Sequence, residues 1–275
     1  MRIVYIAEIV GKSGIWCVKS LLPSLKKEFS PDVIVANADG ATAGHGLGRQ
    51  HAGYLLKLGI DVLTGGDCLY YKKDLVDGLS SLPRVIRPAN YPAESPGRGW
   101  RMVQTAKGNV AVLSLLGRVH FSRVHSDNPF TALDVLSSRL RTETPFILVD
   151  YHAAATAEKL ALAFHADTKV SAVIGSHGRV QTADAGILSG GTGVITDAGR
   201  TGSRDSVGGT ASEPRINEYL TGVPEWSREC WASPVLQGVF LDLDSKGRCV
   251  SINPFSRNGT IPEQELVKMA AEEGV

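Results

Sequence analysis

Residues 146–152 read Phe-Ile-Leu-Val-Asp-Tyr-His, an apolar run that ends in a histidine. A second apolar run, 172–174, leads into Gly-Ser-His-Gly-Arg at 175–179. Short apolar runs bounded by turn residues are typical of buried strands. His152 and His177 are therefore predicted where two strands open into loops, which is where open α/β sheets bind ligands. The two histidines predict half of a metal site, and Arg179 stands where a His-x-His pair would have its second histidine.

The first part of the chain alternates predicted strands with predicted helices, which is typical of βαβ units in a mostly parallel sheet. After about residue 84, strands linked by Gly- and Pro-rich turns predominate. The predicted strands are 2–10, 32–36, 61–64, 84–86, 100–105, 109–116, 146–152, 172–177, 193–197, 236–243 and 247–252. The predicted helices are 13–29 (interrupted by Pro23), 50–58, 130–141, 155–164 and 262–272.

Residues 199–215 are rich in Gly, Ser, Thr and Arg and are predicted to form a long loop, a feature that is often functional in a compact domain. We find no internal repeat and no low-complexity linker. The sequence therefore predicts a single α/β domain over residues 1–275 with two sheets.

Composition narrows the class of protein. The net charge is +1, which gives no electrostatic footprint for nucleic acid or a membrane surface. The four cysteines are scattered and form no Cys-x-x-Cys pair, which suits a reducing compartment. We find neither a cleavable leader nor an apolar stretch long enough to span a bilayer. The sequence predicts a cytoplasmic protein and leaves its oligomeric state open, including a homo-oligomer.

Five strand ends carry a potential metal ligand. One carboxylate after a strand is more often a helix N-cap, and one histidine is usually a polar loop residue. Five such residues on successive strand ends are much harder to explain by chance. A mixed set of carboxylates and imidazoles suits zinc, iron or manganese. The five residues are Glu8, Asp39, Asp67, His152 and His177.

In the order of these residues the chain resembles the calcineurin-like metallophosphoesterase superfamily. It is most similar to the YmdB-like branch, bacterial phosphodiesterases that act on 2′,3′-cyclic nucleotides. The resemblance covers roughly residues 1–222 and implies a sandwich of two mixed β-sheets flanked by helices. It also implies a small phosphodiester or nucleotide as substrate. The segments that carry it include Arg87-Pro-Ala-Asn-Tyr-Pro92, Gly117-Arg-Val119, Asp127-Asn-Pro-Phe130, Val180-Gln-Thr-Ala-Asp184 and Ile195-Thr-Asp197.

The resemblance implies two neighbouring metal positions. One would be held by the positions of Glu8, Asp39, Gly40 and Arg179. The other would be held by Asp39, Asp67, His152 and His177. The first set has lost two ligands, because Gly40 stands where the branch usually has Asn and Arg179 stands in place of a histidine. Arginine stays protonated and does not ligate a metal.

We therefore expect one divalent transition metal per chain (Fe, Mn or Zn). Our hypothesis is that Arg179 replaces the first metal. Its guanidinium would fork onto Glu8, which is one methylene longer than the family's usual Asp, and onto Asp39. The absence of a side chain at Gly40 would leave space for the guanidinium of Arg179.

Cys68 stands where the branch has the histidine thought to protonate the leaving group. A thiol with a pKa near 8.5 is a weak substitute for that acid. The resemblance thus implies catalytic roles for Arg179 and Cys68, with weakened or lost activity. His45, in a loop near Asp39, and Arg118, in a family-like segment, are candidates for binding substrate.

Three functions stay open at this point. The first is a phosphodiesterase with an altered, one-metal site. The second is an inactive relative that binds a nucleotide or a protein as a sensor or scaffold. The third, a serine or cysteine hydrolase using Cys68, lacks a nucleophile-elbow pattern. Residues 222–275 are the least family-like part, and assembly is a candidate role for them.

Overall fold

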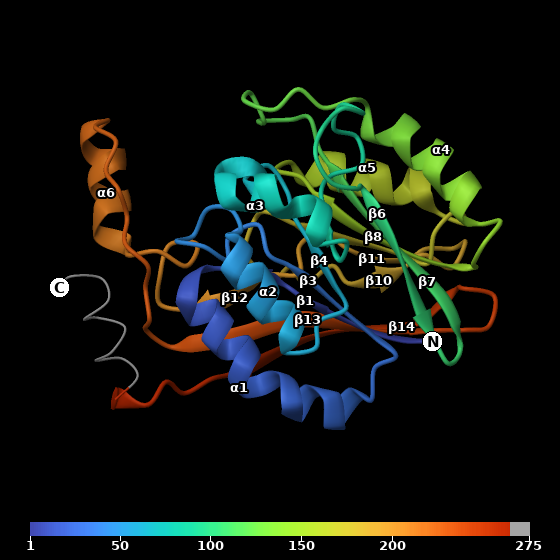
Figure 1. The fold of residues 1–275 in the computed structure, drawn as a ribbon, viewed down its shortest axis with the longest axis horizontal. Coiled ribbons are helices and arrows are strands. Elements are labelled where there is room, and N and C mark those ends of the chain that lie inside the picture. Colours follow the sequence, from blue (N-terminus) through green and yellow to red (C-terminus); the bar gives the residue numbers. More distant parts are fainter. Residues whose placement is uncertain (265–275) are drawn as a thin grey trace.

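The computed structural model describes residues 1–264, so most of the helix predicted at 262–272 lies outside the described part. Two β-sheets pack face to face, and helices cover their outer faces (Figure 1). The predicted architecture, an α/β sandwich of two mixed sheets flanked by helices, is confirmed.

The first sheet has the order β2-β12-β13-β1-β3-β4-β5, with β14 beside β13. Strands β1, β3, β4 and β5 run parallel, and β13 lies antiparallel to β1. Their bounds are β1 Arg2–Ile6, β2 Glu8–Ile9, β3 Val33–Asn37, β4 Val62–Thr64, β5 Val85–Ile86, β12 Arg200–Ser203, β13 Pro234–Leu243 and β14 Cys249–Asn258.

The second sheet has the order β10-β11-β9-β8-β7-β6. Its four inner strands are parallel, and the two edge strands β6 and β10 are antiparallel to their neighbours. The bounds are β6 Trp100–Thr105, β7 Gly108–Leu116, β8 Phe146–His152, β9 Ala172–Ser176, β10 Gly186–Ile187 and β11 Gly193–Ile195.

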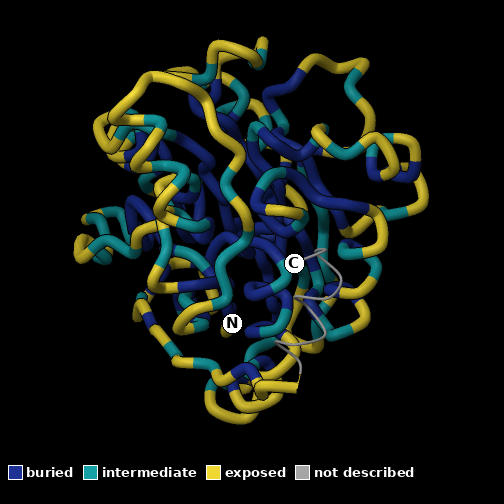
Figure 2. The backbone as a smooth tube through the Cα atoms, turned by 90° about the vertical axis from the view of Figure 1, so that its left-hand side faces the viewer, coloured by how far each residue is buried: buried dark blue, intermediate teal, exposed yellow. Residues whose placement is uncertain are grey.

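Alternating side chains of the strands fill separate layers of the core, because successive residues of a strand face opposite sides. On β1, Ile3 and Tyr5 face the core between the sheets, whereas Val4 and Ile6 face the outer helices. Figure 2 shows the buried strands inside and the exposed loops around them. The helices are α1 Gly11–Phe29, α2 Arg49–Lys57 and α3 Lys73–Gly78 over the first sheet, α4 Pro129–Leu140 and α5 Thr156–Ala166 over the second, and α6 Ser212–Thr221.

Two sequence predictions were wrong in part. Pro23 does not interrupt α1, because burial of the flanking Leu22 and Leu25 outweighs the loss of one backbone hydrogen bond. The long loop predicted at 199–215 contains strand β12 and the start of α6. β12 is polar in sequence but bonds to both β2 and β13, a pairing that its composition does not reveal.

Helix α6 projects from the body in Figure 1 and contributes no buried residue. In the described part of the chain, every helix is too short or too polar to cross a bilayer. The late strands β13 and β14 belong to the first sheet, so most of residues 234–258 complete the fold.

Candidate metal centre

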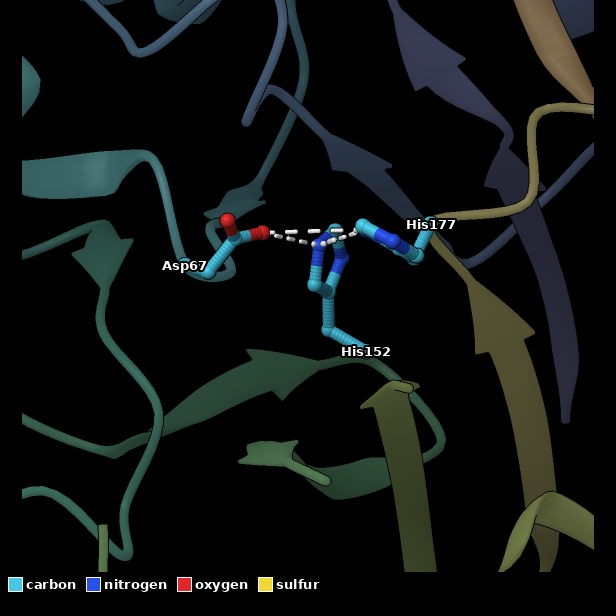
Figure 3. A group of neighbouring side chains, drawn as sticks. All are labelled: Asp67, His152 and His177. Atoms are coloured by element: carbon cyan, nitrogen blue, oxygen red, sulfur yellow. Dashed lines mark hydrogen bonds and ion pairs between the residues drawn. The ribbon is translucent and has the colours of Figure 1, made fainter. Parts of the chain in front are cut away.

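Three predicted ligands meet between the two sheets. Asp67 follows β4, His152 ends β8 and His177 follows β9, and their side chains point toward one another (Figure 3). The Nε2 atom of His152 lies 3.0 Å from Oδ1 of Asp67 and 3.1 Å from Nδ1 of His177. The ligand atoms of all three lie within 4.8 Å of one another. Such a convergence of one carboxylate and two imidazoles fits a divalent transition metal.

Asp39, which follows β3, adds a second carboxylate to this group. Its Oδ2 lies 3.6 Å from Nε2 of His152. Its oxygens are held in place by the backbone N–H groups of Gly66 (2.6 Å) and Cys68 (3.0 Å), which donate to Oδ1 and Oδ2. The side chain is therefore oriented before any ion binds.

Arg179 lies beside this group and contacts Glu8. Its Nε and Nη2 donate to the same carboxylate oxygen, Oε1, at 2.9 and 2.7 Å. A Cβ atom at Gly40 would stand 2.8 Å from Nη2 of Arg179 and 3.0 Å from Oε1 of Glu8, so the missing side chain leaves room for the pair. No hydrogen bond joins Arg179 to Asp39 within residues 1–264, so that part of the expected fork is absent.

The Glu8–Arg179 pair is shielded from solvent. Burial would raise the pKa of Glu8, but the Arg179 guanidinium holds it below its usual range. The other carboxylate oxygen, Oε2, is buried and has no hydrogen-bond partner among the described residues. A single oxygen of Glu8 thus accepts both hydrogen bonds from Arg179.

The ionisation of the predicted ligands is strongly perturbed. Burial and the negative charges of Asp67 and Glu8 raise the pKa of Asp39 to about 6. Burial opposes charge on His152, yet its hydrogen bond to Asp67 and the nearby carboxylates raise its pKa to about 9. Hydrogen bonds from His152 and His177 overcome burial and hold the pKa of Asp67 well below its usual range. In the absence of metal, a proton on His152 balances the carboxylates.

This arrangement predicts a pH dependence of stability for the metal-free protein. A raised histidine pKa contributes stability that is complete below its ordinary value of about 6.5 and is lost as pH rises through about 9. Between pH 6.5 and 9 we expect the Tm in a chelating buffer to fall by about 5 °C. A His152→Gln control should lack this fall, and an equal fall in that variant would contradict the assignment.

The loop that carries His177 and Arg179 has a strained backbone. His177 has φ 92° and Arg179 has φ 57°, the left-handed region that non-glycine residues seldom adopt. Asp197 holds the loop by accepting from the backbone N–H of Gly178 at 2.7 Å, and Lys159 of α5 donates to the same carboxylate oxygen at 2.8 Å. The sequence analysis missed this role, although Asp197 ends the family-like segment 195–197.

A cleft of about 1340 Å³ opens over the metal ligands. Among the residues with predicted catalytic or substrate-binding roles, Arg179, Cys68 and His45 line the cleft, whereas Arg118 does not. The Arg118 side chain is exposed elsewhere, and its backbone N–H donates to Glu158. Tyr219 and Trp226, which the sequence analysis did not place in the site, line the cleft and are 92% and 91% exposed.

Cys68 lies next to the carboxylates but is a weak acid. Its Sγ lies 3.5 Å from Oδ2 of Asp67. Burial and the charges of Asp39 and Asp67 raise the pKa of the thiol well above its usual range. The side chain is therefore a neutral thiol at physiological pH, which disfavours a nucleophilic thiolate at this position.

Comparison with known proteins identifies the family. The model of the YmdB-like protein family matches residues 4–255. The chain belongs to the YmdB-like family. Its match extends beyond residue 222 and includes β13 and most of β14.

Three similar proteins come from known bacteria. The chain is 37% identical over 246 residues to a 2′,3′-cyclic-nucleotide 2′-phosphodiesterase of Bacillus subtilis, with 90% of this chain and 92% of that protein covered. A hypothetical protein from Thermus thermophilus superposes with a TM-score of 0.88 at 32% identity, covering 94% of this chain and 100% of the other. A phosphatase from Mycoplasma pneumoniae superposes with a TM-score of 0.89 at 26% identity, covering 97% and 96%.

Proposed function

We propose that the chain is a phosphodiesterase that hydrolyses 2′,3′-cyclic nucleotides with one divalent transition metal. Asp39, Asp67, His152 and His177 would hold the ion, and Arg179 would stand in place of a second one. The observation that carries this proposal is the convergence of these four side chains beside a guanidinium that is bound to Glu8. The activity of the B. subtilis relative supports the choice of substrate.

The bound ion would supply Lewis-acid stabilisation of the phosphate oxygens and would activate a water molecule for attack. The chain itself supplies positive charge around it. A guanidinium has five N–H donors, and four of those of Arg179 are bonded to Glu8, Gly44 and Gly208. One Nη1 hydrogen is thus left, within residues 1–264, to donate to a phosphate oxygen in the cleft.

Other side chains of the cleft suit a nucleotide. Lys72 and Arg215 line it and add positive charge, and His45 lines it as a donor or acceptor for the ribose or phosphate. Burial and the charge of Arg179 lower the pKa of His45, so this ring is neutral at physiological pH. The Cys68 thiol, which lies beside Asp67, is a weak acid for the leaving group, so we expect slow turnover. General acid catalysis contributes roughly 10²–10⁴-fold.

The test combines metal content with turnover. Elemental analysis of the purified chain should give one transition metal per chain, and 2′,3′-cyclic AMP should be hydrolysed with added manganese or iron. His152→Ala should lose the metal and at least about 10²-fold in turnover. His165→Ala, which removes a half-buried histidine that is bonded to Asp134, should change neither quantity. Two tightly bound metals per chain, or metal binding without any turnover, would overturn the proposal.

A further inference from the structure

A buried chain of hydrogen bonds joins His152 to side chains of both sheets. Ser176 lies 3.0 Å from Nδ1 of His152 and donates to Oδ1 of Asp150 at 2.7 Å. Asn37 lies 2.9 Å from the other oxygen of Asp150 and 3.2 Å from the hydroxyl of Ser176. Thr64 also donates to Oδ2 of Asp150. All five side chains are buried, so bulk solvent does not replace these contacts.

The direction of each hydrogen bond follows from the backbone. The N–H of Asp39 can only donate, and it donates to Oδ1 of Asn37 at 3.0 Å. The amide of Asn37 is therefore oriented with Nδ2 toward Asp150 and Ser176. Its two hydrogens bond to Oδ2 of Asp150 and to the hydroxyl oxygen of Ser176.

These assignments leave one hydrogen-bonding arrangement for the hydroxyl of Ser176. A hydroxyl has one hydrogen and two lone pairs. The hydrogen goes to the Asp150 carboxylate, and one lone pair accepts from Asn37. The second lone pair must accept from Nδ1–H of His152.

We propose that Asp150, acting through Ser176, keeps the proton of His152 on Nδ1 and so reserves Nε2 for the metal. The proposal rests on the metal site of the proposed function. Nε2 is the atom that faces Asp67, Asp39 and His177. Metal-ligating histidines commonly use the other ring N–H to fix their tautomer in this way. Asp150 and Ser176 are thus positioning residues that do not contact the substrate.

Asp150→Asn should reverse the chain of donors without changing its shape. The new amide would keep its oxygen toward Asn37 and Thr64, the two donors, and turn its NH₂ toward Ser176. Both lone pairs of Ser176 would then be occupied, so its hydrogen would be donated to Nδ1 of His152. The neutral ring would carry its proton on Nε2, the atom that the metal needs.

The experiment measures zinc affinity by chelator competition and the tautomer of His152 by ¹⁵N NMR of the ring. Asp150→Asn should bind zinc about 10–100-fold more weakly than the wild type. In metal-free protein at pH 10, where the ring is neutral, the wild type should be protonated at Nδ1 and Asp150→Asn at Nε2. The matched control is Asp134→Asn, which alters an exposed aspartate that also bonds a histidine and should change neither readout.

Unchanged zinc affinity and an unchanged tautomer in Asp150→Asn would overturn the proposal. If the wild type binds no zinc, the proposed function fails. The NMR spectra of the metal-free protein then still test whether Asp150 sets the tautomer of His152. If Asp150→Asn does not fold, Ser176→Ala takes its place. In Ser176→Ala no hydroxyl accepts from Nδ1, so the His152 ring should show a mixture of tautomers. Ser176→Thr keeps the hydroxyl and should restore the single Nδ1–H tautomer. A single Nδ1–H tautomer of His152 in Ser176→Ala would contradict the proposed role of Ser176.

Discussion

Arg179→Met is expected to lower the free energy of unfolding of the metal-free protein by about 3–5 kcal/mol. The variant leaves the charge of Glu8 without a partner, and Glu8 is only 1% exposed. The second oxygen of that carboxylate has no hydrogen bond in the described part of the chain, so Arg179 donates both hydrogen bonds that the Glu8 side chain accepts there. Urea unfolding in a chelating buffer measures the loss.

Two further variants separate the buried charge from the loss of a side chain. Adding Glu8→Gln to Arg179→Met removes the unpaired charge and should recover most of the stability. Arg257→Met breaks an ion pair with Glu28 in which both side chains are at least 40% exposed, and it should cost about 1 kcal/mol or less. If Arg179→Met lowers the free energy of unfolding as little as Arg257→Met does, Arg179 does not stabilise a buried charge on Glu8.

Changing three residues toward the family pattern is expected to turn a one-metal centre into a two-metal centre. The variant combines Glu8→Asp, Gly40→Asn and Arg179→His, which introduces the ligands that the family resemblance implies for the first metal position. A second ion contributes several kcal/mol of charge stabilisation, so turnover of bis-p-nitrophenyl phosphate should rise by about 10²-fold or more. Elemental analysis should give two metals per chain.

The single changes should be far less effective than the combination. Gly40→Asn alone would place its Cβ 2.8 Å from Nη2 of Arg179 and should destabilise the protein. Cys68→His alone restores an acid but no metal, so we expect a smaller gain than the triple variant gives. A large gain from Cys68→His alone would show that the missing acid, rather than the metal count, limits the rate. A triple variant that still binds one metal would contradict the role given to Arg179.

The meeting of the candidate metal ligands was predictable because each one follows a simple pattern. His152 and His177 end apolar runs, and parallel strands bring their carboxyl ends to one edge of a sheet. The pairing of Arg179 with Glu8 could also be expected from charge and from the missing side chain at Gly40. The predicted contact with Asp39 failed because backbone N–H groups already occupy both of its oxygens.

The supporting residues could not be predicted from local sequence. Asp150 lies inside the apolar run 146–152, where a polar residue gives no sign of its partners. Lys159 and Asp197 are 38 positions apart and meet only when α5 packs beside the loop after β11. Local sequence gives no sign that Trp226 lines the cleft, because its exposed position there depends on how α6 leaves the body.

The ligands come in equal numbers from the two halves of the sandwich. Asp39 and Asp67 follow strands of the first sheet, and His152 and His177 belong to the second. An ion held by all four would act as a cross-link between the sheets, so its affinity and the packing between them are thermodynamically linked. Any cavity that loosens this packing, such as one made by Leu148→Ala in the core between the sheets, would weaken metal binding from a distance.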